Sequence, residues 1–189
     1  MSPRVGLDRD KIVIEAAQIA DEYGMEGVTL AALAARLGVR PPSLYNHING
    51  QAELRSLLAV YGLKQLYEAM SSASRGLSGS EAVLAMGKGY AEFAKKHPGL
   101  YEMTLEAPDA NNAELNEEAG YVLKLIISVL APYKLSDEGE LHAVRGLRSI
   151  LHGFASLEQK GGFGIPLDVS VSLSATIHAF LAGIDRFRE

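Results

Sequence analysis

The densest group of side chains able to recognise another molecule lies in the stretch VRPPSLYNHING, residues 39–50. Its hydrogen-bonding and charged members are Arg40, Ser43, Tyr45, Asn46 and His47. Side chains of these types contact base edges and phosphates when a short helix carries them into a groove of DNA. This stretch therefore suits recognition of double-stranded DNA, provided that a helix begins at its two prolines.

The other chemically capable residues are scattered along the chain. The remaining histidines are His97, His142, His152 and His178. The sequence has no HExxH spacing, no glycine-rich phosphate loop and no nucleophile elbow, and Glu158 and Asp168 have no evident partner. The absence of cysteine excludes a disulfide scaffold, a thiolate zinc site and a cysteine nucleophile. We therefore expect a protein that is not an enzyme and that needs neither a metal nor another cofactor.

The composition is that of a soluble globular protein. The chain has 189 residues, of which 48% are hydrophobic and 22% charged, and this length suits one or two domains. Glu15 interrupts the apolar run at the N-terminus, so no signal-peptide core is present. The longest strongly apolar stretch, residues 125–133, is too short to span a bilayer. We expect a cytoplasmic protein without a membrane partner.

The charge of the chain is unevenly distributed. The net charge of -5 argues against a general polyanion binder. Residues 27–64 form a small basic patch, with Arg36, Arg40, Arg55 and Lys64 against the single acid Glu53. Two interpretations remain open: Arg36 and Arg40 contact a few DNA phosphates, or the patch is an ordinary solvated face.

Helical periodicity runs through nearly every segment. The first predicted helix begins after Asp8 as N-cap and ends at Gly24, and its inward stripe is Ile12, Ala16, Ile19 and Tyr23. The second begins at Thr29 and ends at Gly38, with Leu30, Leu33 and Leu37 facing the core. Further helices are predicted over residues 50–74, 80–96, 98–106, 113–131, 137–160 and 168–187.

These helices predict an all-α fold with two parts. Residues 1–50 form a three-helix DNA-binding domain, residues 51–74 a connecting helix, and residues 75–189 a helical effector-binding and dimerisation domain. The Ser- and Gly-rich run at 71–80 marks a junction between the two helical regions. Alternation of Val169, Val171 and Leu173 with serines is also a strand pattern, but helical spacing persists to Ile184 and favours a helix.

The second helix and the opening stretch together predict a helix-turn-helix. Its first helix is residues 29–37, its turn is 38–40, and its recognition helix is 41–48. Gly38 supplies the positive φ that the turn needs. Proline is tolerated at a helix start, where N–H groups have no intrahelical partner, and Pro42 is expected as the first helical residue. Leu44 and Ile48 form the buried face, and Pro42 either contacts a thymine methyl or only positions Ser43.

Residues 8–60 resemble the DNA-binding domain of the tetracycline-repressor-like (TetR) transcriptional regulators. The matching runs are TLAALAARLGV at 29–39, SLYNHI at 43–48, and Glu53-Leu54. The resemblance implies that Arg40, Pro42 and Ser43 face the major groove, while Tyr45 and His47 contact phosphates or position the helix against them. The full set of candidate DNA-binding residues is Thr29, Arg40, Pro41, Pro42, Ser43, Tyr45, Asn46 and His47.

Alternatives remain for some of these side chains. Tyr45 could pack partly against its own domain, His47 could be a structural histidine, and Asn46 could be a plain surface residue. Three positions depart from the pattern of the family. Ile48 replaces a common Phe; Gly50 replaces a frequent capping Ser, so Asn49 is expected to cap the next helix. Gln51 replaces a frequent phosphate-contacting Lys, which predicts weaker non-specific DNA affinity.

For the remainder of the chain, the resemblance implies a helical domain that dimerises and binds a small effector. Residues 151–168 resemble a subgroup with a Trp-His-Gly motif, represented here by His152-Gly153 with Leu151 in the Trp position. His152 is either a core histidine bonded to a neighbouring helix or an effector ligand. A dimer would place two reading heads about 34–36 Å apart, which implies a palindromic operator.

Two sets of apolar residues are candidates for these roles, although each could simply fill the core of one protomer. Candidate dimer contacts lie on the last two long helices: Leu141, Val144, Leu147, Leu151 and Phe154 on 137–160, and Phe180, Leu181 and Ile184 on 168–187. Candidate effector-pocket residues are Met86, Tyr90, Phe93, Tyr101, Met103, Leu125, Ile126, Leu147 and His152. Gly87 and Gly89 inside a helix indicate either tight helix packing or space for a ligand.

The sequence thus predicts a homodimeric repressor that leaves a palindromic operator when a small apolar or weakly polar effector binds. The alternative is a helical small-molecule-binding protein without a regulatory role at DNA.

Overall fold

The computed structural model describes residues 7–105 and 112–188, and every regular element in these two ranges is helical. The longer helices are α1 (Arg9–Gly27), α2 (Leu30–Leu37), α3 (Gln51–Ser74), α4 (Gly79–Lys96), α5 (Pro98–Met103), α6 (Ala113–Leu130), α7 (Asp137–Gln159) and α8 (Val169–Ala182). Short 3-10 helices are η1 (Pro41–Asn46), η2 (Ala131–Tyr133) and η3 (Ile184–Phe187). The predicted all-α fold is confirmed.

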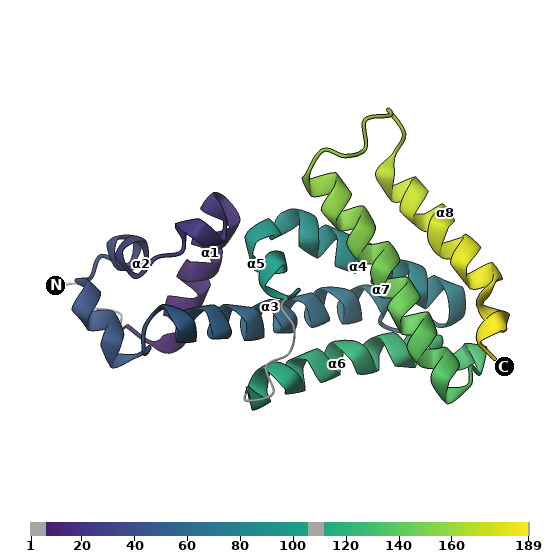
Figure 1. Cartoon of the computed structure of the whole chain (residues 1–189), viewed down its shortest axis with the longest axis horizontal. Helices are drawn as coiled ribbons and strands as arrows, with labels where there is room; N and C mark the ends of the chain where they lie inside the picture. Colours follow the sequence, from purple (N-terminus) through teal and green to yellow (C-terminus); the bar gives the residue numbers. More distant parts are fainter. Residues whose placement is uncertain (1–6, 106–111, 189) are drawn as a thin grey trace.

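One end of the molecule, which we call the head, consists of α1, α2, η1 and the first turns of α3 (Figure 1). Its core contains Ile12, Ala16, Leu33, Leu44, Ile48 and Leu54. Tyr23 was predicted to share the buried stripe of α1, but its side chain is 70% exposed. Gly24, with a φ of 72°, kinks the chain just after it, and Tyr23 lines a surface groove beside Ala32 and Arg36 instead.

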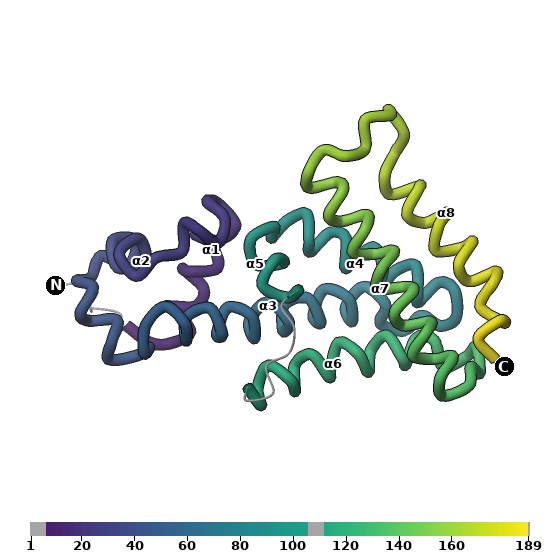
Figure 2. The backbone as a smooth tube through the Cα atoms, in the orientation of Figure 1, coloured from purple at the N-terminus to yellow at the C-terminus, as the bar shows by residue number. Residues whose placement is uncertain are grey.

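The second part of the molecule is built on α3, which runs on from the head and packs against α4 and α6 (Figure 2). Helix α7 crosses this layer, and α8 packs on α7 and α4. Gly87 and Gly89 permit close packing rather than ligand space. A Cβ at Gly89 would lie 2.6 Å from the Ala69 carbonyl oxygen on α3, and one at Gly87 would lie 2.8 Å from Ile177 Cδ1 on α8.

Most predicted helix boundaries agree with the structure, with three differences. The first helix, predicted to end at Gly24, is kinked there and ends at Gly27. The helix expected over 98–106 ends at Met103, and the one expected over 168–187 is α8 followed by the 3-10 turn η3. Residues 169–173 are helical, so the strand alternative is wrong; Asp168 caps them by accepting the N–H of Ser170 at 2.8 Å.

Within the described ranges no single helix is long and apolar enough to cross a bilayer. Residues 113–133 and 137–159 would suffice together by length and apolar content, but this pair is bent by 117°.

Candidate nucleic-acid interface and interior cavity

The turn before η1 has the geometry that its sequence predicts. Gly38 adopts the left-handed conformation with a φ of 67°, which residues with a Cβ rarely adopt. Its N–H bonds to the Ala35 carbonyl at 3.1 Å, and the Val39 N–H reaches back to Ala34 at 3.0 Å. These bonds satisfy the last carbonyls of α2 and fix the direction in which η1 leaves it.

The recognition segment is a 3-10 helix over Pro41–Asn46, shorter than the helix expected over 41–48. Pro41, not Pro42, is its first residue, and Arg40 is its N-cap. Because neither proline has an N–H, the first donor is Ser43, which bonds to the Arg40 carbonyl three residues back at 2.9 Å. Because this first bond spans three residues instead of the four of an α-helix, the segment starts as a 3-10 helix, which is wound more tightly.

The segment buries one face and exposes the other. Leu44 and Ile48 are 0% and 1% exposed, as their spacing predicts. The side chain of Tyr45 is 59% exposed, so it is mainly a surface group rather than a packed one. The other candidate contacts share this surface: Arg40, Pro41, Pro42 and Asn46 are exposed, while Ser43 and His47 are half-buried.

Thr29, the remaining candidate contact, lies at the N-terminus of α2. Its hydroxyl accepts the N–H of Ala32 at 3.1 Å, so it caps that helix as predicted. The residue is exposed, and its backbone stands where a helix N-terminus can meet a phosphate.

The helix after the recognition segment is capped differently from the prediction. Gly50, not Asn49, occupies the N-cap position of α3. The Asn49 N–H donates to Glu53 Oε2 at 2.6 Å, which holds the pKa of Glu53 below its usual value, and Glu53 also pairs with Arg9. Gln51 turns inward, where its amide donates to the Val28 carbonyl and ties α3 to the connection between α1 and α2.

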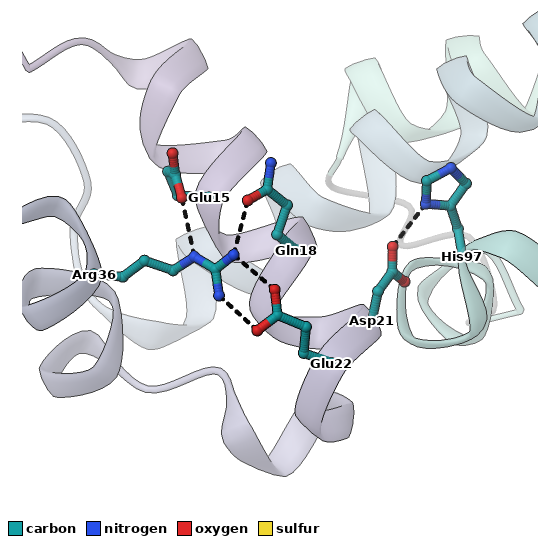
Figure 3. Close-up of polar contacts among 6 residues, drawn as sticks. All are labelled: Glu15, Gln18, Asp21, Glu22, Arg36 and His97. Atoms are coloured by element: carbon teal, nitrogen blue, oxygen red, sulfur yellow. Dashed lines mark hydrogen bonds and ion pairs between the residues drawn. The ribbon is translucent and has the colours of Figure 1, made fainter.

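Arg36, for which a contact to DNA phosphates was one of two open interpretations, bonds to other residues of the head (Figure 3). Its guanidinium bonds to Glu15 at 3.0 Å, to Gln18 at 2.8 Å and to both carboxylate oxygens of Glu22 at 2.7 and 2.8 Å. The bond from Arg36 lowers the pKa of Glu22, and the same bond raises the pKa of Arg36. Arg36 therefore holds α2 against α1, which favours a structural role, and its phosphate contact stays a prediction.

The basic patch is consequently weaker than its residue count suggests. Lys64 pairs with Glu114 and Glu118 of α6 at 3.0 and 3.7 Å. Arg40, by contrast, is exposed and has no ion pair or side-chain hydrogen bond to any residue that the structure describes. Arg40 is thus the available positive charge beside the recognition segment.

A joint that the sequence did not reveal connects the head to the second part of the molecule (Figure 3). Asp21 of α1 bonds to His97 Nδ1 at 2.7 Å and accepts the Leu100 N–H at 3.0 Å, so its carboxylate caps the start of α5. Gly99 lies against α1, where a Cβ would be 2.0 Å from the Ala20 carbonyl oxygen. The His97-Pro98-Gly99 sequence indicates a helix start, but it does not identify Asp21, which lies far away in the chain, as the partner.

A partly open cavity of about 100 Å³, which we call the interior cavity, lies among α3, α4, α5, α6 and α7. Of the predicted pocket residues, Tyr90, Met103 and Ile126 line it. Met86, Phe93, Leu125 and Leu147 do not contribute to its wall, and Met86 and Leu147 are fully buried core residues. Lining residues absent from the prediction include Leu63, Leu66, Thr104, Leu115, Val122, Val144 and Arg148.

Tyr101 and His152 lie behind the cavity wall and connect to it through Tyr90. The hydroxyls of Tyr90 and Tyr101 are 2.8 Å apart, and the Tyr101 hydroxyl is 2.7 Å from His152 Nδ1. Burial raises the pKa of both tyrosines, so both hydroxyls stay protonated at neutral pH. His152 is therefore bonded to a neighbouring helix, as one of its two predicted roles requires.

The predicted dimer residues divide into two groups. Leu151 and Ile184 are each 1% exposed and Leu181 is 9% exposed, because they fill the core between α4, α7 and α8. Their side chains have little accessible surface to bury against a second copy, so they are core residues of one protomer rather than dimer contacts. Phe154 and Phe180 are half-buried. Leu141 and Leu157 on α7 and Val171 on α8 have exposed apolar side chains.

Comparison with known proteins places this architecture in a family. Residues 12–55 match the family described as "Bacterial regulatory proteins, tetR family", and residues 83–180 match "Tetracyclin repressor-like, C-terminal domain". The HTH-type transcriptional regulator YobS of Bacillus subtilis (strain 168) is 42% identical over 184 residues, which cover 97% of this chain and 96% of YobS. The Trp-His-Gly subgroup stays a prediction.

Solved structures show the same fold at low sequence identity. A protein from Rhodococcus sp. RHA1 superposes with a TM-score of 0.83 at 20% identity, over 100% of both chains. A TetR variant from Acinetobacter baumannii AYE in complex with minocycline has a TM-score of 0.73 at 18% identity and covers 97% of this chain and 99% of its own. The chain belongs to the TetR family of bacterial regulatory proteins and is a DNA-binding transcriptional regulator.

Proposed function

We propose that the chain is a homodimeric repressor that reads an inverted repeat with residues 40–47 of each copy and leaves it when a small, largely apolar effector binds. The observation that carries the proposal is the recognition segment. Its polar side chains point outward, its apolar pair is buried, and Arg40 beside it has no ion pair among the described residues. Such a segment can insert into a major groove without first breaking internal contacts.

A dimer is proposed for a geometric reason and is supported by the surface of α7 and α8. One 3-10 helix contacts only a few base pairs, so a second head one helical turn away adds both affinity and specificity. The exposed side chains of Leu141, Leu157 and Val171 place apolar area on these two helices. Burial of such area against a second copy would stabilise the assembly.

The proposed release mechanism uses α5 as the link between the cavity and the head. Met103 and the following Thr104 line the cavity, while His97, Gly99 and Leu100 at the other end of α5 contact α1. A ligand that fills the cavity better in one position of α5 would therefore favour one position of the head. The minocycline complex of the Acinetobacter relative supports ligand binding by this fold by analogy.

Selection of bound duplexes from a random pool, followed by sequencing, tests the proposal. We expect an inverted repeat whose half-sites lie one helical turn apart, and we expect Arg40→Ala with Tyr45→Ala to abolish the enrichment. Recovery of sequences without an inverted repeat would contradict the dimeric repressor.

A further inference from the structure

Among the described residues, the wall of the interior cavity carries one positively charged side chain and no negatively charged one. Arg148 of α7 is its charged member and is also exposed to solvent, and Tyr90 and Thr104 supply hydroxyls. The other described side chains that line it are Leu, Ile, Val, Met and Ala, and none of them is a carboxylate. A cavity of this composition is apolar over most of its surface and positive at one point.

Arg148 has no counter-ion within the described part of the molecule. Arg36, Lys64 and Lys95 all form ion pairs, but no ion pair or side-chain hydrogen bond engages Arg148. Its positive charge nevertheless acts on Tyr90 and Tyr101. Burial raises the pKa of both hydroxyls, and the charge of Arg148 lowers it in part. A guanidinium offers N–H donors in a planar fork that fits a carboxylate.

The tyrosine chain determines what Tyr90 can offer to a ligand. If His152 Nδ1 carries a hydrogen, it donates to Tyr101, Tyr101 donates to Tyr90, and the hydrogen of Tyr90 is free for an acceptor in the cavity. The opposite tautomer would make Tyr90 donate to Tyr101. Thr104 is already engaged, since its hydroxyl donates to the Tyr101 carbonyl at 2.7 Å. When His152 Nδ1 carries the hydrogen, Arg148 and Tyr90 can therefore act together on one acceptor group.

We propose that the ligand of this cavity is a small amphipathic acid, whose carboxylate pairs with Arg148 and Tyr90 and whose apolar body lies among Leu66, Met103 and Ile126. This inference deepens the proposed function, because it takes the cavity to be the effector site. The volume of about 100 Å³ limits the apolar body. A cavity of roughly 150 Å³ holds a benzene ring, so a short branched chain fits without rearrangement and an aromatic ring requires slight expansion.

Calorimetry on the full chain with matched probes tests the inference. The probes are isovalerate against isovaleramide and benzoate against benzamide, which differ in charge but hardly in shape. We expect each acid to bind at least about 10-fold more tightly than its amide, because a hydrogen-bonded ion pair is stronger than neutral hydrogen bonds. Arg148→Gln should remove this preference and Arg148→Lys should retain part of it. Arg145→Gln, earlier on α7 and outside the cavity wall, should leave it intact.

Three outcomes would overturn the inference: no binding by either acid, equal binding of acids and amides, or a preference that survives Arg148→Gln. Light scattering on the same variants measures dimerisation and so tests whether Arg148 instead contacts a second copy of the chain. If Arg148→Gln weakens dimerisation and leaves the preference unchanged, Arg148 serves a second copy of the chain. The calorimetric assay contains no DNA, so the preference for acids can be observed even if the operator selection finds no inverted repeat. The failure of one proposal is therefore distinguishable from the failure of the other.

Discussion

The recognition segment and the interior cavity are organised in opposite ways. In the segment, Arg40, Tyr45 and Asn46 face solvent without side-chain hydrogen bonds to described residues. In the cavity region, Tyr90, Tyr101 and His152 bond to one another. The first arrangement keeps donors free for a large polyanion that supplies many partners. The second bonds the Tyr90, Tyr101, His152 and Thr104 side chains to protein groups in advance, so a small ligand meets few polar groups that still need a partner.

The two regions also differ in how they are held in place. Neighbouring residues build the recognition segment, and two buried side chains anchor it. Side chains from distant parts of the chain build the cavity, and α5 joins it to the head through Asp21 and Gly99. Mutations in the segment should therefore act on the head alone, whereas mutations near α5 should act on both regions.

The largest expected effect is loss of the anchor of the segment. Leu44→Ala removes a fully buried side chain and should lower the free energy of unfolding by about 2–5 kcal/mol. Urea denaturation followed by circular dichroism measures it. Leu77→Ala is the control, since Leu77 is 44% exposed and its truncation should cost under about 1 kcal/mol. Equal losses for the two variants would mean that Leu44 does not anchor η1.

The next effect concerns the joint between α5 and the head. Gly99→Ala places a Cβ 2.0 Å from the Ala20 carbonyl oxygen, so backbone must move and stability should fall by about 3 kcal/mol. The matched control is Gly120→Ala in α6, where a Cβ meets nothing within 4 Å. That variant should be neutral or up to about 1 kcal/mol more stable. Thermal unfolding compares them, and a harmless Gly99→Ala would disprove the tight joint.

A smaller effect is expected at the tyrosine chain behind the cavity. Tyr101→Phe removes the hydroxyl shared by Tyr90 and His152 and should cost about 1–2 kcal/mol, because the buried Tyr90 hydroxyl and the half-buried His152 ring lose their partner. Tyr121→Phe removes an exposed hydroxyl that bonds to Glu117 and should change stability by less than about 0.5 kcal/mol. Urea midpoints separate the two cases, and indistinguishable midpoints would show that the chain contributes nothing.

The smallest effect is the pH dependence of the Arg36 cluster. Arg36 lowers the pKa of Glu22 below its unfolded value of about 4.5, so the stabilisation is present above that pH and is lost as pH falls through the lowered folded pKa. Glu22→Gln should therefore show a smaller drop in melting temperature between pH 7 and pH 3 than the parent chain. Glu26→Gln, which does not contact Arg36, should retain the full drop; the reverse order would contradict the assignment.

The segment could be predicted from the sequence because its determinants are local. The turn needs Gly38, the prolines set the start, and the spacing of Leu44 and Ile48 identifies the buried face. The 3-10 geometry of the segment and its end at Asn46 were missed although they are local. Other misses depend on residues outside the segment: the partners of Arg36 lie on α1, and Gln51 bonds to Val28. A count of charges cannot show that a neighbouring helix already neutralises one of them.

The cavity was predicted only in part because periodicity identifies an inward face but not the helix that it meets. Leu125 and Ile126 are adjacent, yet only Ile126 lines the cavity, while Leu125 faces a hollow beside Ser71 and Pro132. Arg148 was missed because a charged residue on an amphipathic helix is expected to face solvent; Arg148 is indeed exposed, and it lines the cavity as well. The Asp21–His97 contact joins residues far apart in the chain, and no local pattern predicts it.

The central claim is that residues 40–47 form the DNA-reading surface, and the affinity of Arg40→Gln for a selected operator duplex tests it most directly. Fluorescence anisotropy over a range of salt concentrations compares this variant with the parent chain and with Lys88→Gln, an exposed lysine of α4. We expect about a 10-fold loss of affinity for Arg40→Gln, with a salt dependence shallower by about one ion per copy, and no loss for Lys88→Gln. Unchanged affinity for Arg40→Gln, or equal losses for both variants, would contradict the central claim.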